Sequence, residues 1–368
     1  MTVKRIIALA LSAIMLFAFS ACSETDGDST TEESSSVPTS ETTEAESTQA
    51  ESDGTDDEKI LDIYIIAGQS NACGYTNITN RQALLSQAPE LEKGFSNVHY
   101  SGNARSDIDY TTLVNNVKPW QKTTLGLGAS SGKIGPEAGM ADALSAYYNE
   151  DTGKHAGIIK YAHGGTCLLN EYGGSNQHGN WVSPTYAQTL GVKYEGATGG
   201  LYRGLLEQVE KSLSELDEYG FAGVSIKAMY WMQGESDRAK PAEYKKAFEY
   251  FVADLRTDLS LLLNEYTDST DDCGALEMPV FVGTISETFS LSASDTEGTS
   301  NKAFIQMQKT LPSSIDACYI VDNSTYKMGE WKSGALTVLG SDPYHWNQAD
   351  AFIIGKNVGD AMLSVGID

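Results

Sequence analysis

Basic residues are scarce in this sequence of 368 residues, in which 25 lysines and arginines stand against 50 aspartates and glutamates. The formal charge of −25 divides into +2 for residues 1–22, −13 for residues 23–58 and −14 for residues 59–368. So negative a folded part disfavours nucleic acids and other polyanions as partners, because like charges repel. A neutral polymer or a small molecule fits the composition better.

Sequence patterns typical of metal binding are also missing. No two cysteines are separated by two residues, and the five histidines do not cluster at the spacing of metal ligands. We therefore expect no structural zinc and no cofactor. The four cysteines after Cys22 permit two interpretations, disulfides formed after export or buried free thiols; they are Cys73, Cys167, Cys273 and Cys318.

The N-terminus has the pattern of an export signal. Lys4 and Arg5 precede an apolar stretch over residues 6–19 that is too short for a comfortable membrane span, and the segment FSAC then ends at Cys22. This pattern resembles a bacterial lipoprotein signal with a lipid on Cys22; a plain secretory signal or a short membrane anchor is the alternative. We predict an extracellular protein that its lipid anchor holds at the bacterial cell surface.

Residues 23–58 lack lysine, arginine and aromatic side chains, and consist almost wholly of Ser, Thr, Glu and Asp. Such a segment cannot bury enough apolar surface to fold, so it is predicted to be a disordered acidic tether. The folded domain is then expected over residues 59–368.

The folded part alternates strand-like and helix-like segments. Strands are predicted at residues 61–67, 156–162, 224–232, 278–285 and 317–322, and helices at 136–150, 199–216, 241–266, 301–311 and 347–363. This alternation predicts a three-layer α/β/α sandwich with a mostly parallel, five-stranded sheet. Residues 76–130 and 167–198 have weak periodicity and are expected to be long loops that form a wall of the substrate site.

The first predicted strand stops on the segment GQSN, which spans residues 68–71. Taken alone, a serine in this position is most often a helix cap. At the carboxyl end of a parallel strand, however, the hydroxyl of Ser70 would be exposed where ligands bind in such sheets. Serine is a weak nucleophile until a base takes its proton, so a catalytic role requires a histidine elsewhere in the chain.

The segment SDPYHWN, just ahead of the last predicted helix, supplies a base. Asp342 precedes His345 by three residues, so one turn can bring its carboxylate to the imidazole Nδ1–H. His99, His155 and His178 lie in polar stretches, whereas His163 follows the second predicted strand.

Two further segments at strand ends offer hydrogen-bond donors for an oxyanion. HGGT contains Gly164 and Gly165, whose N–H groups can approach a ligand closely because no side chain intervenes. QGESD begins with Gln233, whose side-chain amide is a donor. A tight turn and a loop-bracing amide are the alternative interpretations.

The order GQSN, HGGT, QGESD and DPYH resembles that of the SGNH hydrolase superfamily, in the branch that contains sialate O-acetylesterases and the acetyl xylan esterases of carbohydrate esterase family six. The resemblance covers most of residues 60–366 and implies a flavodoxin-like fold. It implies that Ser70 is the nucleophile, His345 the base and Asp342 the residue that orients it. The oxyanion donors that it implies are the N–H of Ser70, the N–H of Gly164 or Gly165, and Gln233, which replaces the asparagine of many members.

The resemblance also implies an activity: removal of O-acetyl groups from a glycan such as acetylated xylan through an acetyl-serine intermediate, without metal or cofactor. A sialate O-acetylesterase is the near alternative, and an exported binding lipoprotein without catalysis is the alternative of another class. Trp346, next to His345, is expected to form an apolar platform for the sugar, with core packing as the alternative. Glu235 and Asp237 are interpreted as loop structure, with contact to the substrate as the alternative, for Glu235 in particular.

Overall fold

The computed structural model describes residues 59–103, 117–171, 179–266, 274–292, 294–328, 330–332, 335–337 and 342–366. All of the described residues belong to one compact unit, Asp56–Asp368. The predicted signal, Cys22 and the predicted tether lie outside the described residues, as do His178 and Cys273.

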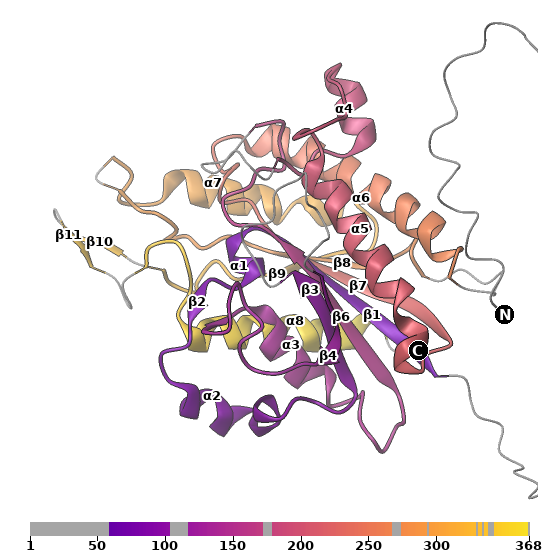
Figure 1. Ribbon diagram of the computed structural model, residues 1–368. Coiled ribbons are helices and arrows are strands. Elements are labelled where there is room, and N and C mark those ends of the chain that lie inside the picture. The colour runs from indigo at the N-terminus through magenta and orange to yellow at the C-terminus, as the bar shows by residue number, and fades with distance from the viewer. Residues whose placement is uncertain are drawn as a thin grey trace, which may run out of the picture. The chain divides into compact units, whose positions relative to one another are not determined.

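A mostly parallel sheet forms the centre of this unit, in the order β4-β3-β6-β1-β7-β8-β9 (Figure 1). All neighbouring strands are parallel except the edge pair β3 and β4. The five predicted strands are confirmed as β1 (Ile60–Gly68), β6 (His155–Ala162), β7 (Gly223–Met232), β8 (Val280–Gly283) and β9 (Cys318–Val321).

The sheet has seven strands, so the prediction of five was wrong. The two additional strands, β3 (Val98–Asn103) and β4 (Val117–Lys122), lie within the stretch that the sequence pattern assigned to a loop. Both mix polar with apolar residues, and Gly102 and Pro119 interrupt them; proline is tolerated there because β4 is an edge strand. Their sequences therefore lack the continuous apolar runs of the central strands.

Helices cover both faces of the sheet (Figure 1). The five predicted helices are confirmed as α3 (Pro136–Leu144), α5 (Gly200–Ser214), α6 (Pro241–Leu263), α7 (Thr299–Gln308) and α8 (Gln348–Gly366). α3 packs against α8 on one face, and α6 packs against α5 and α7 on the other. Three short helices were not predicted: α1 (Ser70–Cys73), α2 (Arg81–Gln87) and α4 (Pro184–Leu190).

Short antiparallel pairs complete the described elements, β2 (Thr76–Asn77) with β5 (Lys133–Ile134) and β10 (Glu330–Lys332) with β11 (Ala335–Thr337). Three of the cysteines, Cys73, Cys167 and Cys318, are buried and free, which favours the free-thiol interpretation for them. None of the helices formed by the described residues has the length and hydropathy needed to cross a bilayer.

Glycines let α3 and α8 approach each other closely. A Cβ atom added at Gly355 would lie 2.1 Å from the carbonyl oxygen of Pro136, and one at Gly139 would lie 1.9 Å from that of Phe352. Neither position tolerates a larger residue without a shift of backbone. α8 begins three residues after His345. The contact between α3 and α8 therefore also fixes the position of the loop that carries His345.

We predict that Gly355→Ala destabilises the protein by about 1–3 kcal/mol, because the added methyl group overpacks the helix contact. It should also lower kcat/KM for ester hydrolysis, since α8 can relieve the clash only by moving with its preceding loop. Urea unfolding and initial rates measure both effects. Gly132→Ala is the matched control, because a Cβ there meets no atom within 4 Å; equal behaviour of the two variants would contradict the prediction.

A histidine pair lies toward the opposite, amino-terminal edge of the sheet. His99 Nε2 and His155 Nδ1 are 3.2 Å apart, the two rings stack at 5.4 Å, and Phe221 packs edge-on against both. Burial, followed by the nearby charges of His155 and Lys122, lowers the pKa of His99 from 6.5 to about 4. His99 is therefore neutral in the folded protein at neutral pH.

Stability should consequently fall as the pH is lowered from 6.5 to 4. In this window His99 is protonated in the unfolded chain and neutral in the folded one, so the unfolded state binds more protons and acid favours it, by up to about 3 kcal/mol. We predict that His99→Gln loses less stability than the parent between pH 7 and pH 4.5, measured by urea unfolding. Equal losses of stability in the parent and in His99→Gln would show that protonation of His99 does not cause the effect.

Candidate active site

Four sequence segments that are far apart in the chain meet at the carboxyl edge of the sheet. GQSN follows β1, HGGT follows β6, QGESD follows β7, and DPYH precedes α8. β1 lies between β6 and β7, and the strand ends are joined there: Gln69 N donates to Met232 O (2.9 Å) and His163 N to Gly68 O (3.1 Å). The topology therefore brings the predicted site residues to one place, at the centre of the sheet.

Ser70 is the first residue of α1 and does not cap it, because the N-cap position belongs to Gln69. The cap interpretation of Ser70 is thus wrong. The Ser70 hydroxyl makes no hydrogen bond with any described residue, and the residue is 8% exposed. Its backbone N–H lies in the first helical turn, where an N–H has no intrahelical acceptor. Both the hydroxyl and the N–H are available to a ligand.

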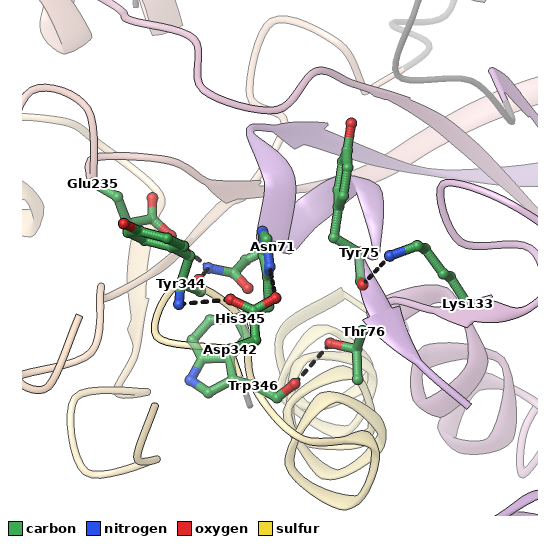
Figure 2. A network of polar contacts seen from close by, with 9 residues as sticks. All are labelled: Asn71, Tyr75, Thr76, Lys133, Glu235, Asp342, Tyr344, His345 and Trp346. Carbon is green, nitrogen blue, oxygen red and sulfur yellow. Dashed lines mark hydrogen bonds and ion pairs between the residues drawn. The ribbon is translucent and has the colours of Figure 1, made fainter. Parts of the chain in front are cut away.

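His345 is held by a short hydrogen bond and by a ring contact. Its Nδ1 lies 2.6 Å from Asp342 Oδ2, and the other carboxylate oxygen of Asp342 accepts from the N–H of Tyr344 at 2.9 Å (Figure 2). Tyr75 stacks on the imidazole, with ring centroids 5.3 Å apart and planes inclined by 14°. When Nδ1–H donates to the carboxylate, Nε2 is the ring nitrogen that can accept a proton.

The described residues contain no hydrogen bond between Ser70 and His345. Catalytic hydrogen bonds are often long in the absence of substrate and shorten in the complex, so this geometry is compatible with proton transfer. The side chain of His345 is 15% exposed and that of Asp342 is 39% exposed. The pair is therefore reachable from solvent, as a site for an external ligand requires.

The HGGT turn presents two backbone donors. Neither Gly164 N–H nor Gly165 N–H donates a hydrogen bond to another described residue, and Gly165 has the left-handed φ of +70°. A Cβ at Gly164 would lie 3.2 Å from the hydroxyl of Tyr75. The turn thus passes close to the ring that stacks on His345. Both glycines remain candidates for an oxyanion donor.

The amide of Gln233 braces the loops under the site. It is fully buried, and its Nε2 lies 2.9 Å from Thr166 O, 2.6 Å from Asp237 Oδ2 and 3.2 Å from Gln69 Oε1. An amide nitrogen has two hydrogens, so these acceptors use both. Gln233 can donate to an oxyanion only by giving up one of these partners, which differs from the free donor expected from the sequence.

Asp237 is the anion at the centre of this bracing. In addition to the Gln233 bond it accepts from the N–H groups of Leu168 (2.9 Å) and Leu169 (3.4 Å). Burial raises the pKa of Asp237 to about 6, against the opposing effect of these hydrogen bonds. The carboxylate therefore joins the QGESD loop to the chain that follows HGGT, as expected for a residue of loop structure.

Glu235 is a second buried acidic residue, and its position fits the interpretation as loop structure better than the alternative of substrate contact. Its side chain is fully buried, and Oε1 accepts from Asn71 Nδ2 at 2.7 Å. The same Asn71 nitrogen lies 3.3 Å from Tyr344 O (Figure 2). Burial raises the pKa of Glu235. Asn71 and Glu235 therefore link the GQSN segment to the loop that carries His345.

Trp346 is also buried, so it cannot present its ring to a sugar as expected. It is 4% exposed, and its backbone carbonyl accepts from the hydroxyl of Thr76 at 2.9 Å. Trp120 and Trp181 are equally buried, at 3% and 0% exposed. These tryptophans serve core packing.

Sequence reasoning missed Tyr75 and the buried cation Lys160. Lys160 Nζ, on β6, donates to Cys73 O (3.0 Å), to Leu127 O (2.6 Å) and to Glu137 Oε2 (2.9 Å) with no exposure to solvent. It thereby fixes the end of α1 at Cys73. The next residue, Gly74, has a left-handed conformation and ends the helix. A lone lysine within an apolar strand was the available signal.

The residues described by the structure contain no group of three or more His, Cys, Asp or Glu side chains that could hold a metal ion. At the sheet edge, the hydroxyl of Ser70, the His345–Asp342 pair and free backbone donors lie on neighbouring segments. Such a set performs acyl transfer.

We predict that Asn71→Ala lowers the free energy of unfolding by about 1–3 kcal/mol, because it leaves the buried Glu235 carboxylate without its donor. Asn71→Ala combined with Glu235→Gln should recover part of this loss, since the remaining buried group is then neutral. Urea unfolding of the single and double variants provides the measurement. Additive losses would contradict the proposed pairing.

Comparisons with known proteins agree with this geometry. The family model "Carbohydrate esterase, sialic acid-specific acetylesterase" matches residues 60–364. A solved structure of a protein from Arabidopsis thaliana is 18% identical with a TM-score of 0.52, over 84% of this chain and 100% of that chain. The crystal structure of NanS is 14% identical with a TM-score of 0.50, over 83% of this chain and 98% of that chain.

At these identities the two structures support the fold, and a comparison with curated proteins finds no match. The family match extends over most of the chain and includes every segment that meets at the sheet edge. The chain therefore belongs to the carbohydrate esterase family of sialic acid-specific acetylesterases, and it is an esterase that removes O-acetyl groups from sugars.

Proposed function

We propose that Ser70 is the nucleophile of a two-step ester hydrolysis, that His345 is its general base and that Asp342 orients the imidazole. The observation that carries this proposal is the 2.6 Å bond between His345 Nδ1 and Asp342 Oδ2 at the same sheet edge as an unpartnered serine hydroxyl. The bond fixes the tautomer in which Nε2 accepts a proton, and it stabilises the imidazolium that forms.

In the first step Ser70 Oγ attacks the carbonyl carbon of an acetyl ester while its proton passes to His345 Nε2. The carbonyl oxygen becomes an oxyanion that accepts hydrogen bonds from Ser70 N–H and from Gly164 or Gly165 N–H, whereas Gln233 keeps the loops in place. Each such donor contributes about 2.7–4 kcal/mol to lowering the barrier. The sugar alcohol leaves with the proton from His345, and Ser70 carries the acetyl group.

In the second step a water molecule attacks the acetyl-serine carbonyl as His345 takes its proton. The tetrahedral intermediate collapses to acetate, and Ser70 recovers its proton from His345. The protein groups account for every bond made and broken, so the sequence of steps needs no metal or cofactor.

The proposed substrate is an O-acetylated glycan outside the cell. The charge of −14 over residues 59–368 favours a neutral polymer such as acetylated xylan. The family description favours an O-acetylated sialic acid as the second candidate. A lipid on Cys22 and the tether over residues 23–58 would keep the enzyme at the cell surface, within reach of either material.

We predict that Ser70→Ala lowers kcat/KM for acetate release at least about 10³-fold, because no other described hydroxyl can take its place in the triad geometry. Acetate release is measured from acetylated xylan and from O-acetylated sialic acid, with residues 59–368 as the parent. Ser214→Ala, at the end of α5, is the matched control and should keep the parent activity.

If Ser70→Ala keeps the activity of the parent, the nucleophile assignment is wrong. If neither protein releases acetate from either material while both unfold cooperatively, the chain is a binding protein. If both esters are hydrolysed, the ratio of the two kcat/KM values identifies the preferred glycan.

A further inference from the structure

Three loops contact one another through side chains next to the segment that carries His345. The loop after β7 carries Arg238, the loop after β8 carries Phe289, and the loop before α8 carries Tyr344. The Arg238 guanidinium lies 5.1 Å from the centroid of the Phe289 ring, and the Phe289 and Tyr344 ring centroids are 5.8 Å apart. Figure 2 shows Tyr344 beside Glu235, with Tyr75 on the other side of His345.

Arg238 is linked by contacts to the segment that carries Ser70 and to the segment that carries His345. Its Nη1 donates to the backbone carbonyl of Glu235 at 2.6 Å, and Glu235 in turn accepts from Asn71, the neighbour of Ser70. Through Phe289 it reaches Tyr344, the neighbour of His345. Arg238 is therefore placed next to the two segments that carry Ser70 and His345.

The guanidinium has hydrogen-bonding capacity that the described residues do not use. Arginine has five N–H donors, and here the single Nη1 bond to Glu235 O uses one of them. No ion pair joins Arg238 to a carboxylate in the described parts of the chain, although the residue is half-buried against an aromatic ring. Four N–H donors in a planar fork match the two oxygens of a carboxylate.

The other described arginines do not offer this combination. Arg203 donates to Thr198 O and Gly196 O and covers the Tyr194 ring, and Arg256 donates to Met278 O and Asp316 O. Both are thus engaged in holding loops. Arg81 begins α2 and contacts none of the site residues.

Tyr344 supplies a second feature that a sugar subsite needs. The residue is 49% exposed although its ring packs on Phe289. An exposed aromatic face beside a charged fork provides an apolar surface for a pyranose ring and a fixed position for its acid group. Tyr344 thus offers the platform that the buried Trp346 does not.

We propose that Arg238 and Tyr344 form a subsite for a sugar that bears a carboxylate, with Arg238 binding the carboxylate while Ser70 attacks an acetyl ester on the same molecule. This inference rests on the proposed function and narrows its substrate class to acidic sugars. Sialic acids and uronic acids both carry the required carboxylate, and the experiment separates them.

The experiment compares acids with matched neutral esters. Acetate release is measured from an O-acetylated sialic acid and from its carboxylate methyl ester, and from acetylated xylo-oligosaccharides with and without a glucuronic acid branch. The parent should prefer the acid form in one of the pairs by about 10- to 100-fold in kcat/KM, as a charge-assisted bidentate contact gives. The pair that shows this preference identifies the sugar.

Arg238→Met should abolish the preference, mainly through KM, so that kcat/KM on the preferred acid falls to the value for its neutral counterpart. Arg238→Lys should keep part of the preference, because a lysine keeps the charge but loses the fork. Arg81→Met removes the same charge from α2 and should keep the full preference. An equal loss on every ester in Arg238→Met would show a structural role and overturn the proposal.

Lys133 provides a second discriminating variant. Its Nζ donates to Tyr75 O at 2.7 Å and lies 5.2 Å from the Tyr75 ring, on the other side of His345 (Figure 2). If Lys133→Met abolishes the acid preference and Arg238→Met keeps it, the carboxylate binds there and the assignment to Arg238 is wrong.

The experiment distinguishes failure of the carboxylate subsite from failure of the proposed function. Ser70-dependent hydrolysis without any acid preference overturns the carboxylate subsite alone. If no ester yields Ser70-dependent acetate, the proposed function fails, and calorimetry with free sialic acid and glucuronic acid then tests the subsite directly. Binding of either acid to Ser70→Ala that is lost when Arg238→Met is added supports the subsite, and unchanged binding or no binding overturns it.

Discussion

The site depends on the central position of β1 in a parallel sheet. Because β6 and β7 flank β1 in the same direction, the segments that follow all three strands emerge at one edge. Two backbone bonds, Gln69 N to Met232 O and His163 N to Gly68 O, continue the pairing past the strand ends. The serine, the glycine pair and the bracing amide therefore keep their relative positions through backbone geometry, before any side-chain contact contributes.

Buried polar groups then fix the loops that the backbone leaves free. Glu235, Asp237 and the Lys160–Glu137 pair are all removed from water, and each holds a backbone or amide group of a segment next to the site. Burial raises the pKa of both Glu235 and Asp237. Burial disfavours the charge of Lys160, but Glu137, Tyr100 and Cys73 together outweigh that effect, so the pKa of Lys160 is raised. A buried charge without its partner is costly, so such contacts are retained only in the arrangement that satisfies them.

The sequence was sufficient for the elements whose signal is local. The five predicted strands and five predicted helices follow from apolar runs, and the four segments that meet at the sheet edge follow from the order of four short motifs. β3 and β4 were not predicted, because strands that mix polar with apolar residues and contain glycine or proline lack that signal. The burial of Gln233, Glu235 and Trp346 depends on contacts between segments more than 60 positions apart, such as Asn71 with Glu235, and no spacing rule reports those. The role of Tyr75 was not predicted for the same reason, because the ring that it stacks on, His345, is distant in the sequence.

The net charge of the domain favours a neutral substrate, whereas the local charge of Arg238 favours an acidic one. The distance between each protein charge and the substrate decides which effect is stronger. The charge of −14 is spread over residues 59–368, and salt screens exposed charges beyond about 8 Å at physiological ionic strength. It therefore disfavours a polyanion that must lie along the surface, but acts weakly on a single carboxylate at contact distance from one guanidinium. Arg238 is half-buried, so its own field is screened less than that of the surface acids. An acidic domain can thus bind one acidic sugar unit, provided that the cation stands at the site itself.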